Sequence, residues 1–327
     1  MKTKVIVITG PTAVGKSLAT VKLAKLMNTE VISADSMQIY KYMDIGTAKI
    51  STEEMQGIKH HLIDKFTPDI PYSVAIFKNL AKKLIDDISS AGKIPIICGG
   101  TGFYINALLH DVSFEDDAIP SISNTVAYRD ELLQLTKTHD VNFIHNMLKA
   151  IDPQSAKTIP SNNIKRVIRA LEFYKQHNMP ISTHNSNQKA KKMAYDAKVF
   201  ILNQNRDNLY KKINKRVDDM IAKGLLQEVN MLLSMGYSPS SISMQALGYK
   251  QILAYLDGKC SLQHAIEAIK QGSRRFAKRQ ITWFKHQLNT TENQNEQVIW
   301  LNTEDYTDIN SLACHIYNNY NKLHPET

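Results

Sequence analysis

Residues 5–17 read Val-Ile-Val-Ile-Thr-Gly-Pro-Thr-Ala-Val-Gly-Lys-Ser, an apolar run that leads directly into a glycine-rich turn. The β-branched residues at its start predict a buried strand. Residues 10–17 match G-x-x-x-x-G-K-[ST], in which backbone N–H groups cradle phosphate oxygens and a helix follows. The stretch therefore predicts an α/β fold with a P-loop NTPase-like core built on a parallel sheet.

The phosphate site is expected to use the whole turn. The glycines permit the tight bend, Lys16 supplies positive charge, and Ser17 is the predicted metal ligand for Mg²⁺. The pattern leaves ATP, another nucleotide and a prenyl diphosphate open as the ligand. The residues predicted to bind phosphate are Gly10, Pro11, Thr12, Ala13, Val14, Gly15, Lys16 and Ser17.

Composition narrows the class of protein. The chain has 327 residues, long enough for two structural units, and a net charge of +9. Such a net charge favours a polyanionic partner, above all nucleic acid. A generally basic surface without such a partner would also explain the net charge. Its three cysteines lack metal-ligand spacing, and no apolar run reaches membrane-spanning length. We expect a cytoplasmic protein with reduced thiols, no membrane partner and a monomeric state.

Further apolar runs predict more strands of the same sheet. They lie at residues 30–34, 94–98, 199–202 and 298–301, with a short candidate at 60–64. Asp35 follows the first of them, at the edge where parallel sheets bind ligands. Its spacing fits a functional carboxylate and a helix N-cap equally well. The paired histidines at 60 and 61 predict no metal site, because adjacent strand residues face opposite ways.

A second glycine-rich turn, Gly99-Gly-Thr-Gly-Phe-Tyr104, follows the strand at 94–98. We expect it to lie beside the phosphate loop. Nucleotide hydrolases often end such a strand in an Mg²⁺-binding aspartate, so Gly-Gly-Thr argues against ATP hydrolysis. Thr101 then remains as a neutral hydroxyl donor near the phosphates.

The strand pattern stops between about residues 112 and 197, which predicts a helical insertion. The expected division is a catalytic core at 1–112 and 198–327 and an insertion at 113–197. Lys165, Arg166 and Arg169 fall within one helical turn. They indicate either a solvated face or a surface for a polyanion.

The C-terminal part carries the strongest basic pattern. Arg274, Arg275, Lys278 and Arg279 are predicted to share one helix face, and no acidic residue occurs from 268 to 291. Trp283 and Phe284 are expected to back this face, as in helices that contact nucleic acid. A solvated face would explain the aromatics but not the missing acids. Residues 244–250 predict a loop leading into a helix with an exposed Tyr249.

Seven segments together resemble the bacterial tRNA dimethylallyltransferases: residues 10–17, 35–40, 44–49, 60–64, 99–104, 245–249 and 277–284. The resemblance extends to about Trp300. It implies a P-loop core interrupted by a helical tRNA-binding insertion. It also implies transfer of a dimethylallyl group from dimethylallyl diphosphate to the N6 amine of the adenosine 3′ of the anticodon. The P-loop would then hold the diphosphate of the donor, with help from Mg²⁺.

The resemblance also implies roles for individual residues. Asp35 would be the general base, while Thr101 and Arg216 would act on the diphosphate. Ser17 stands where threonine is more usual, Arg129 is a weakly aligned candidate, and the zinc motif of some eukaryotic relatives is missing. The implied tRNA-binding residues are Asp35, Ser36, Met37, Gln38, Thr101, Arg129, Lys165, Arg166, Val167, Ile168, Arg169, Met244, Gln245, Ala246, Leu247, Gly248, Tyr249, Arg274, Arg275, Lys278 and Arg279.

Three other functions remain open at this point. A small-molecule P-loop kinase would explain the phosphate loop and Asp35 but not the basic helices. A non-catalytic RNA-binding protein would tolerate loss of Asp35. A prenyltransferase acting on free nucleotides would have little need of a basic insertion, and its reaction would depend weakly on salt.

Overall fold

The computed structural model describes residues 2–114, 122–140, 142–189, 192–288 and 297–323. The chain divides into two compact units, residues 1–109 with 193–327, and residues 110–192. We call them the core unit and the inserted unit. Met193 and Tyr195, expected in the insertion, are buried in the core unit just before its fifth strand.

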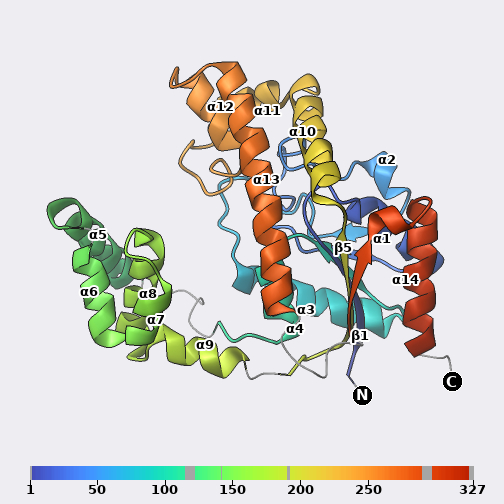
Figure 1. The fold of residues 1–327 in the computed structure, drawn as a ribbon, viewed down its shortest axis with the longest axis horizontal. Coiled ribbons are helices and arrows are strands. Elements are labelled where there is room, and N and C mark those ends of the chain that lie inside the picture. Colours follow the sequence, from blue (N-terminus) through green and yellow to red (C-terminus); the bar gives the residue numbers. More distant parts are fainter. Residues whose placement is uncertain (1, 115–121, 141, 190–191, 289–296, 324–327) are drawn as a thin grey trace. The chain divides into compact units, whose positions relative to one another are not determined.

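The core unit is built on a six-stranded sheet in which every pair of neighbouring strands is parallel (Figure 1). The strand order is β3-β2-β4-β1-β5-β6. The strands are β1 (Lys4–Thr9), β2 (Val31–Ser33), β3 (His60–His61), β4 (Ile96–Gly99), β5 (Asp196–Asn203) and β6 (Val298–Asn302). The predicted parallel α/β fold is confirmed.

The central strand β1 is buried on both faces. Val5 and Val7 belong to one hydrophobic cluster, whereas Ile6 and Ile8 belong to another. This division follows from the two-residue repeat of a strand, which directs successive side chains to opposite faces. The apolar run of the sequence therefore fixes β1 at the centre of two cores.

Helices cover both faces of the sheet. The helices of the core unit are α1 (Lys16–Leu26), α2 (Thr52–Met55), α3 (Val74–Ser90), α4 (Gly102–Leu109), α10 (Arg206–Ala222), α11 (Leu225–Ser234), α12 (Tyr249–Leu256), α13 (Leu262–Gln287) and α14 (Ile309–Leu323), with a 3₁₀ turn at Thr303–Asp305. The basic segment 274–285 lies within α13. In the described part of the chain, no helix is long and apolar enough to span a membrane.

The strand predicted at 60–64 is shorter than expected. Only His60 and His61 pair with β2, because the chain then leaves the extended conformation. Leu62 and Asp64 adopt φ values of 61° and 51°, in the left-handed region that interrupts a strand. The edge of the sheet therefore ends in a tight loop.

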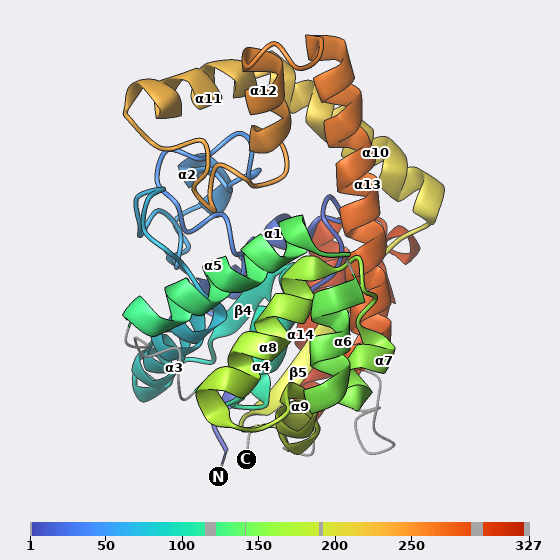
Figure 2. The same cartoon turned by 90° about the vertical axis from the view of Figure 1, so that its left-hand side faces the viewer.

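In the described residues of the inserted unit, all the regular secondary structure is helical (Figure 2). Its helices are α5 (Ile122–Thr138), α6 (Asn142–Ile151), α7 (Pro153–Thr158), α8 (Ile164–His177) and α9 (Ile181–Lys189). A separate hydrophobic cluster fills it, with Leu132, Ile144 and Leu148 among its members. Asp152 caps α7 through Ser155 N–H (2.9 Å) and also accepts hydrogen bonds from Ser182.

Candidate active site

The phosphate loop joins β1 to α1. At one of its positions, Gly10, the backbone conformation and the close neighbours permit only glycine. Gly10 has a φ of 145°, and a Cβ atom there would lie 2.3 Å from the carbonyl oxygen of Leu202. Gly15, with a φ of 99°, turns the chain into α1. The N-terminus of α1 therefore begins at Lys16, as phosphate binding requires.

Two cationic side chains lie at this loop, Lys16 from the loop itself and Arg216 from α10. Lys16 Nζ donates a hydrogen bond to the carbonyl of Pro11 (2.7 Å), and Arg216 Nη1 donates one to Thr12 Oγ1 (3.4 Å). Both side chains are half-buried, and no carboxylate of a described residue lies within ion-pair distance of either. Burial lowers the pKa of Lys16 to about 8 and lowers the pKa of Arg216. Enclosed cations without an acidic partner are suited to an anionic ligand.

The second glycine-rich turn lies beside the phosphate loop, as predicted. Thr9 Oγ1 donates to the carbonyl of Gly99 (2.8 Å). The buried amide of Gln280, in α13, bridges the two turns: its Oε1 accepts from Thr12 N–H and its Nε2 donates to Gly100 O, both at 2.9 Å. Sequence reasoning missed Gln280, because a glutamine in a basic helix resembles a solvent-exposed residue.

The glycines of this second turn permit close approach of α13. A Cβ atom on Gly100 would lie 2.4 Å from Gln280 Nε2, and one on Gly102 would lie 2.3 Å from the Trp283 ring. Trp283 thus packs on the turn, while Phe284 is fully buried. The contact makes α13 a wall of the site.

The structure places Asp35 both at the start of a turn and at the wall of a cavity. Its Oδ1 accepts hydrogen bonds from the N–H groups of Met37 (2.8 Å) and Gln38 (3.3 Å), so the carboxylate caps the following turn. The same residue also lines a cavity. Thr101 Oγ1 accepts from Ser36 N–H (3.2 Å), which joins the Asp35 turn to the second glycine-rich turn.

The cavity has a volume of about 600 Å³ and lies entirely within the core unit. Thr12 and Thr101 line it together with Asp35, which is the one acidic side chain among its described lining residues. Its basic lining residues are Arg216, Lys250, Arg275 and Arg279. This balance of charge suits a ligand that carries several negative charges.

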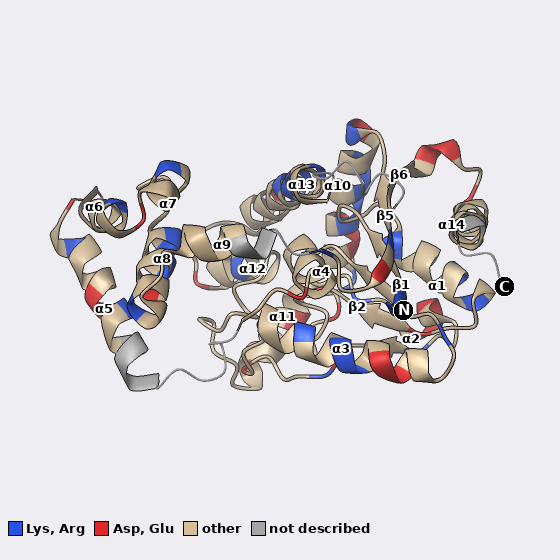
Figure 3. Ribbon diagram, turned by 90° about the horizontal axis from the view of Figure 1, so that it is seen from below, with Lys and Arg blue, Asp and Glu red and all other residues tan. Residues whose placement is uncertain are grey.

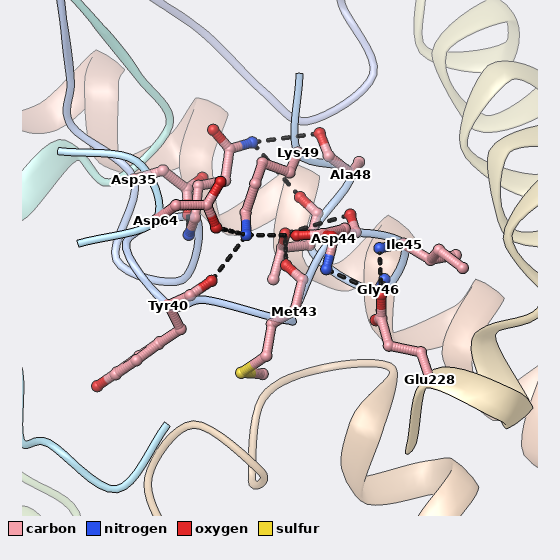
Figure 4. A network of polar contacts seen from close by, with 12 residues as sticks. Asp35, Tyr40, Met43, Asp44, Ile45, Gly46, Ala48, Lys49, Asp64 and Glu228 are labelled. Atoms are coloured by element: carbon pink, nitrogen blue, oxygen red, sulfur yellow. Dashed lines mark hydrogen bonds and ion pairs between the residues drawn. The ribbon is translucent and has the colours of Figure 1, made fainter. Parts of the chain in front are cut away.

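A loop at residues 44–49 forms another part of the cavity wall, through Gly46, Thr47 and Ala48. Lys49, whose side chain is only 4% exposed, donates to Tyr40 O (2.7 Å) and to one carboxylate oxygen each of Asp44 and Asp64 (both 2.5 Å; Figure 4). Sequence reasoning did not identify Lys49. Its position in a turn-rich segment gave no sign of burial.

The basic residues of α13 do not act as one face. Arg275 and Arg279 line the cavity, and the Arg279 guanidinium lies 5.9 Å from the ring centre of Phe276. Arg274 instead donates to Asn214 Oδ1 of α10 (2.6 Å), while Lys278 is exposed. The four residues of the predicted basic face therefore differ in their contacts, and Lys and Arg are frequent on α13 and α10 (Figure 3).

The expectation of an exposed Tyr249 is wrong. Met244 and Tyr249 are both fully buried, so their side chains cannot meet a macromolecule in this structure. Ala246, Leu247 and Gly248, between them, line the cavity. Gln245 is exposed and donates to Pro239 O (2.8 Å).

In the inserted unit, the predicted tRNA-binding segment is only partly exposed. Lys165, Arg166 and Arg169 reach the surface of α8. Val167 and Ile168 do not: their side chains are 0% and 3% exposed and belong to the core of the unit, which corrects the prediction.

Arg129 takes part in an internal ion pair of the inserted unit. Its Nε and Nη2 atoms donate to the two carboxylate oxygens of Glu172, at 2.7 and 2.8 Å. The glutamate side chain is 6% exposed and the arginine 53%. The two-pronged contact joins α5 to α8, and it uses the donors of the residue that the resemblance offers as a candidate for tRNA binding.

The predicted metal ligand, Ser17, occupies the first turn of α1 and is half-buried. Among the described residues, no group of three or more His, Cys, Asp or Glu side chains is arranged to hold a metal ion. Mg²⁺ needs no such cage, since it commonly binds one or two protein oxygens together with phosphate and water. The donors present fit that mode of binding.

The family model described as IPP transferase matches residues 38–287. The chain belongs to the IPP transferase family. Curated relatives in this family include the tRNA dimethylallyltransferase of Lachnoclostridium phytofermentans, 47% identical over 307 residues and 94% of each chain. That of Acetivibrio thermocellus is 48% identical over 302 residues and 92% of each chain.

Solved structures of the family share the fold. A tRNA delta(2)-isopentenylpyrophosphate transferase from Staphylococcus epidermidis is 42% identical with a TM-score of 0.70, and the alignment covers 98% of this chain and 100% of that one. A eukaryotic dimethylallyltransferase, described as acting on tRNA, is 29% identical with a TM-score of 0.80, over 99% of this chain and 80% of that one.

Proposed function

We propose that this chain is a tRNA dimethylallyltransferase. It transfers a dimethylallyl group from dimethylallyl diphosphate to the N6 amine of the adenosine 3′ of the anticodon, releasing diphosphate. One observation carries the proposal. A cavity whose described lining has a single acidic residue, Asp35, adjoins the phosphate loop, where Lys16 and Arg216 have no acidic partner among the described residues. The names of the curated relatives support the same reaction.

The phosphate loop would hold the diphosphate of the donor. Negative charge grows on this leaving group as its bond to the prenyl carbon breaks. Lys16, Arg216 and the N–H groups of the loop would stabilise that charge. Thr101, which lines the cavity, adds a hydroxyl donor.

Mg²⁺ would bind at Ser17 and at the diphosphate, where it would supply further positive charge to the leaving group. The side chain of Ser17 offers the hydroxyl oxygen that this requires.

Asp35 would act as the general base. The adenine amine is a weak nucleophile, because its lone pair is delocalised into the ring. As the bond from N6 to the prenyl carbon forms, the proton of the amine passes to the carboxylate. Since Oδ1 already accepts two N–H groups, Oδ2 is the oxygen left to take the proton.

The basic side chains would hold the anticodon stem and loop. Arg275 and Arg279 line the cavity, and exposed cations on α8 offer further phosphate contacts. The target base would leave its stack to enter the cavity, which costs less from a loop than from a duplex. We further propose a monomer that works in the cytoplasm.

The decisive experiment is a transfer assay with radiolabelled dimethylallyl diphosphate, unmodified tRNA and Mg²⁺, without ATP. We expect label in tRNA. Label in free AMP or ADP would point to a free-nucleotide prenyltransferase. Phosphate released from added ATP, with no label in tRNA, would point to a kinase.

A further inference from the structure

Glu228, in α11, is a buried carboxylate that the reaction as described does not use. Its side chain receives four hydrogen bonds. Oε2 accepts from the N–H groups of Asp44 (2.9 Å) and Ile45 (2.7 Å), and Oε1 accepts from Gly46 N–H (3.0 Å) and the Tyr249 hydroxyl (2.6 Å). Only 7% of the residue is exposed.

The two segments that Glu228 joins are both walls of the cavity. Residues 46–48 line it from one segment and residues 246–248 from the other. The segments also meet directly, because a Cβ atom on Gly46 would lie 2.5 Å from the Tyr249 ring. The carboxylate thus fixes the separation of two cavity walls.

The same network reaches the turn that carries Asp35. Gln38, whose N–H is capped by Asp35, donates through Nε2 to the carbonyl of Ala48 (3.2 Å). Lys49 then joins residues 40, 44 and 64, as Figure 4 shows. A continuous set of hydrogen bonds therefore runs from the proposed general base to the loop held by Glu228.

We propose that Glu228 is a positioning residue for the acceptor nucleotide. By holding the loop at 44–48 against the segment at 246–249, it sets the end of the cavity that receives the adenosine and aligns the N6 amine with Asp35. This inference rests on the proposed function. It gives Glu228 a role in that reaction although Glu228 touches neither substrate.

The hydrogen bonds to Glu228 match the acceptor pattern of a carboxylate. Four donors converge on it, and a carboxylate offers about four lone-pair positions with no proton of its own. Burial and the neighbouring Glu228 raise the pKa of Tyr249, so the phenol keeps its proton and donates it. An amide in place of the carboxylate would point an NH₂ group at backbone N–H donors and leave them unpaired.

The test is Glu228→Gln, assayed with unmodified tRNA and dimethylallyl diphosphate. We expect the KM for tRNA to rise by about 10-fold to 100-fold, the range for hydrogen bonds to a charged group. The Kd for dimethylallyl diphosphate should stay within about twofold, because the P-loop makes none of these bonds. Tyr249→Phe removes one donor of four and should raise the KM for tRNA by about threefold to tenfold.

Glu304→Gln is the matched control. Glu304 also accepts a backbone N–H, from Asn205 (2.9 Å), but it is exposed and lies outside the cavity lining. An unchanged KM for tRNA in folded Glu228→Gln would overturn the inference, as would an equal loss of diphosphate affinity. If that variant does not fold, Tyr249→Phe decides by the same criteria. Failure of the wild-type protein to label tRNA would instead overturn the proposed function.

Discussion

The charged side chains near the two ends of the cavity differ in how many hydrogen-bond partners they have within the protein. At the phosphate loop, Lys16 and Arg216 are half-buried and, in the described structure, lack a carboxylate partner. At the other end, Glu228 accepts four hydrogen bonds and Lys49 donates three. The charges proposed to bind a ligand have few partners within the protein, whereas the charges that hold the cavity walls are fully hydrogen-bonded there.

Asp35 allows the sharpest test of this difference, because its Oδ1 is bonded and its Oδ2 is not among the described contacts. Asp35→Asn keeps an oxygen for the cap and removes the base. We expect turnover to fall by about two to four decades, the usual contribution of a general base. Binding of tRNA should change by less than about twofold. Single-turnover rates and filter binding measure the two quantities.

Asp35→Ala serves as the comparison, because it removes the cap as well as the base. If Asp35 were only a cap, Asp35→Asn would keep wild-type single-turnover rates and Asp35→Ala alone would be impaired.

Lys16→Met should weaken ligand binding and yet stabilise the protein. The loss of a charged donor should raise the Kd for dimethylallyl diphosphate by about 10-fold to 100-fold. Burial lowers the pKa of Lys16 from 10.5 to about 8. Below pH 8 the folded protein therefore carries a buried ammonium group that lowers its free energy of unfolding. The variant should therefore gain about 1–3 kcal/mol in free energy of unfolding at pH 7. That gain should disappear as the pH rises from 8 to 10.5.

The control for this stability change is Lys49→Met. Lys49 has three acceptors within the protein, so its removal should lower the free energy of unfolding at pH 7. Urea unfolding of both variants measures the two changes. If Lys16→Met also lowered the free energy of unfolding, the proposed difference between Lys16 and Lys49 would be contradicted.

The affinity for the donor should depend on pH through Lys16. The Lys16 ammonium, proposed to bind the diphosphate, is present below pH 8 and is lost above it. Between pH 7 and pH 9, the Kd for dimethylallyl diphosphate should rise by about tenfold in the wild-type protein relative to Lys16→Met. The variant corrects for titration of the ligand. Parallel pH profiles of the two proteins would contradict this assignment.

The smallest expected effect concerns the salt dependence of tRNA binding. Arg275→Ala with Arg279→Ala removes two cavity cations and should reduce the log–log slope by about one to two units. Arg274→Ala on the same helix should change it by less than about half a unit, because Asn214 already binds that guanidinium. Equal slopes in the double variant and the wild-type protein would show that Arg275 and Arg279 face away from RNA.

Local chemistry explains why the strands, the phosphate loop and Asp35 could be predicted from the sequence. The apolar run of β1 and the glycines of the loop determine their own conformation. Gln280, Lys49 and Glu228 could not be found in this way. Gln280 bonds to Thr12, 268 positions away, and Glu228 to Asp44, 184 positions away, so only the folded chain reveals their partners.

Val167, Ile168 and Tyr249 are buried within motifs that the resemblance assigns to tRNA as unbroken runs of residues. A helix on a surface buries one side and exposes the other, so consecutive residues cannot all face a partner. The spacing of Val167 and Ile168 from the apolar Leu171 already fitted the buried side of α8.

One hydrogen bond of the core unit has a consequence for folding. Ala194 N–H donates to Leu109 O (2.7 Å), so the chain leaves and re-enters the sheet domain at a single point. Bringing those ends together across a disordered segment of this length would cost about 4 kcal/mol of chain entropy. The helices of residues 110–192 have mainly local contacts, which favour rapid folding. We expect them to form early and shorten the loop, before the strands on either side of the insertion pair in the parallel sheet.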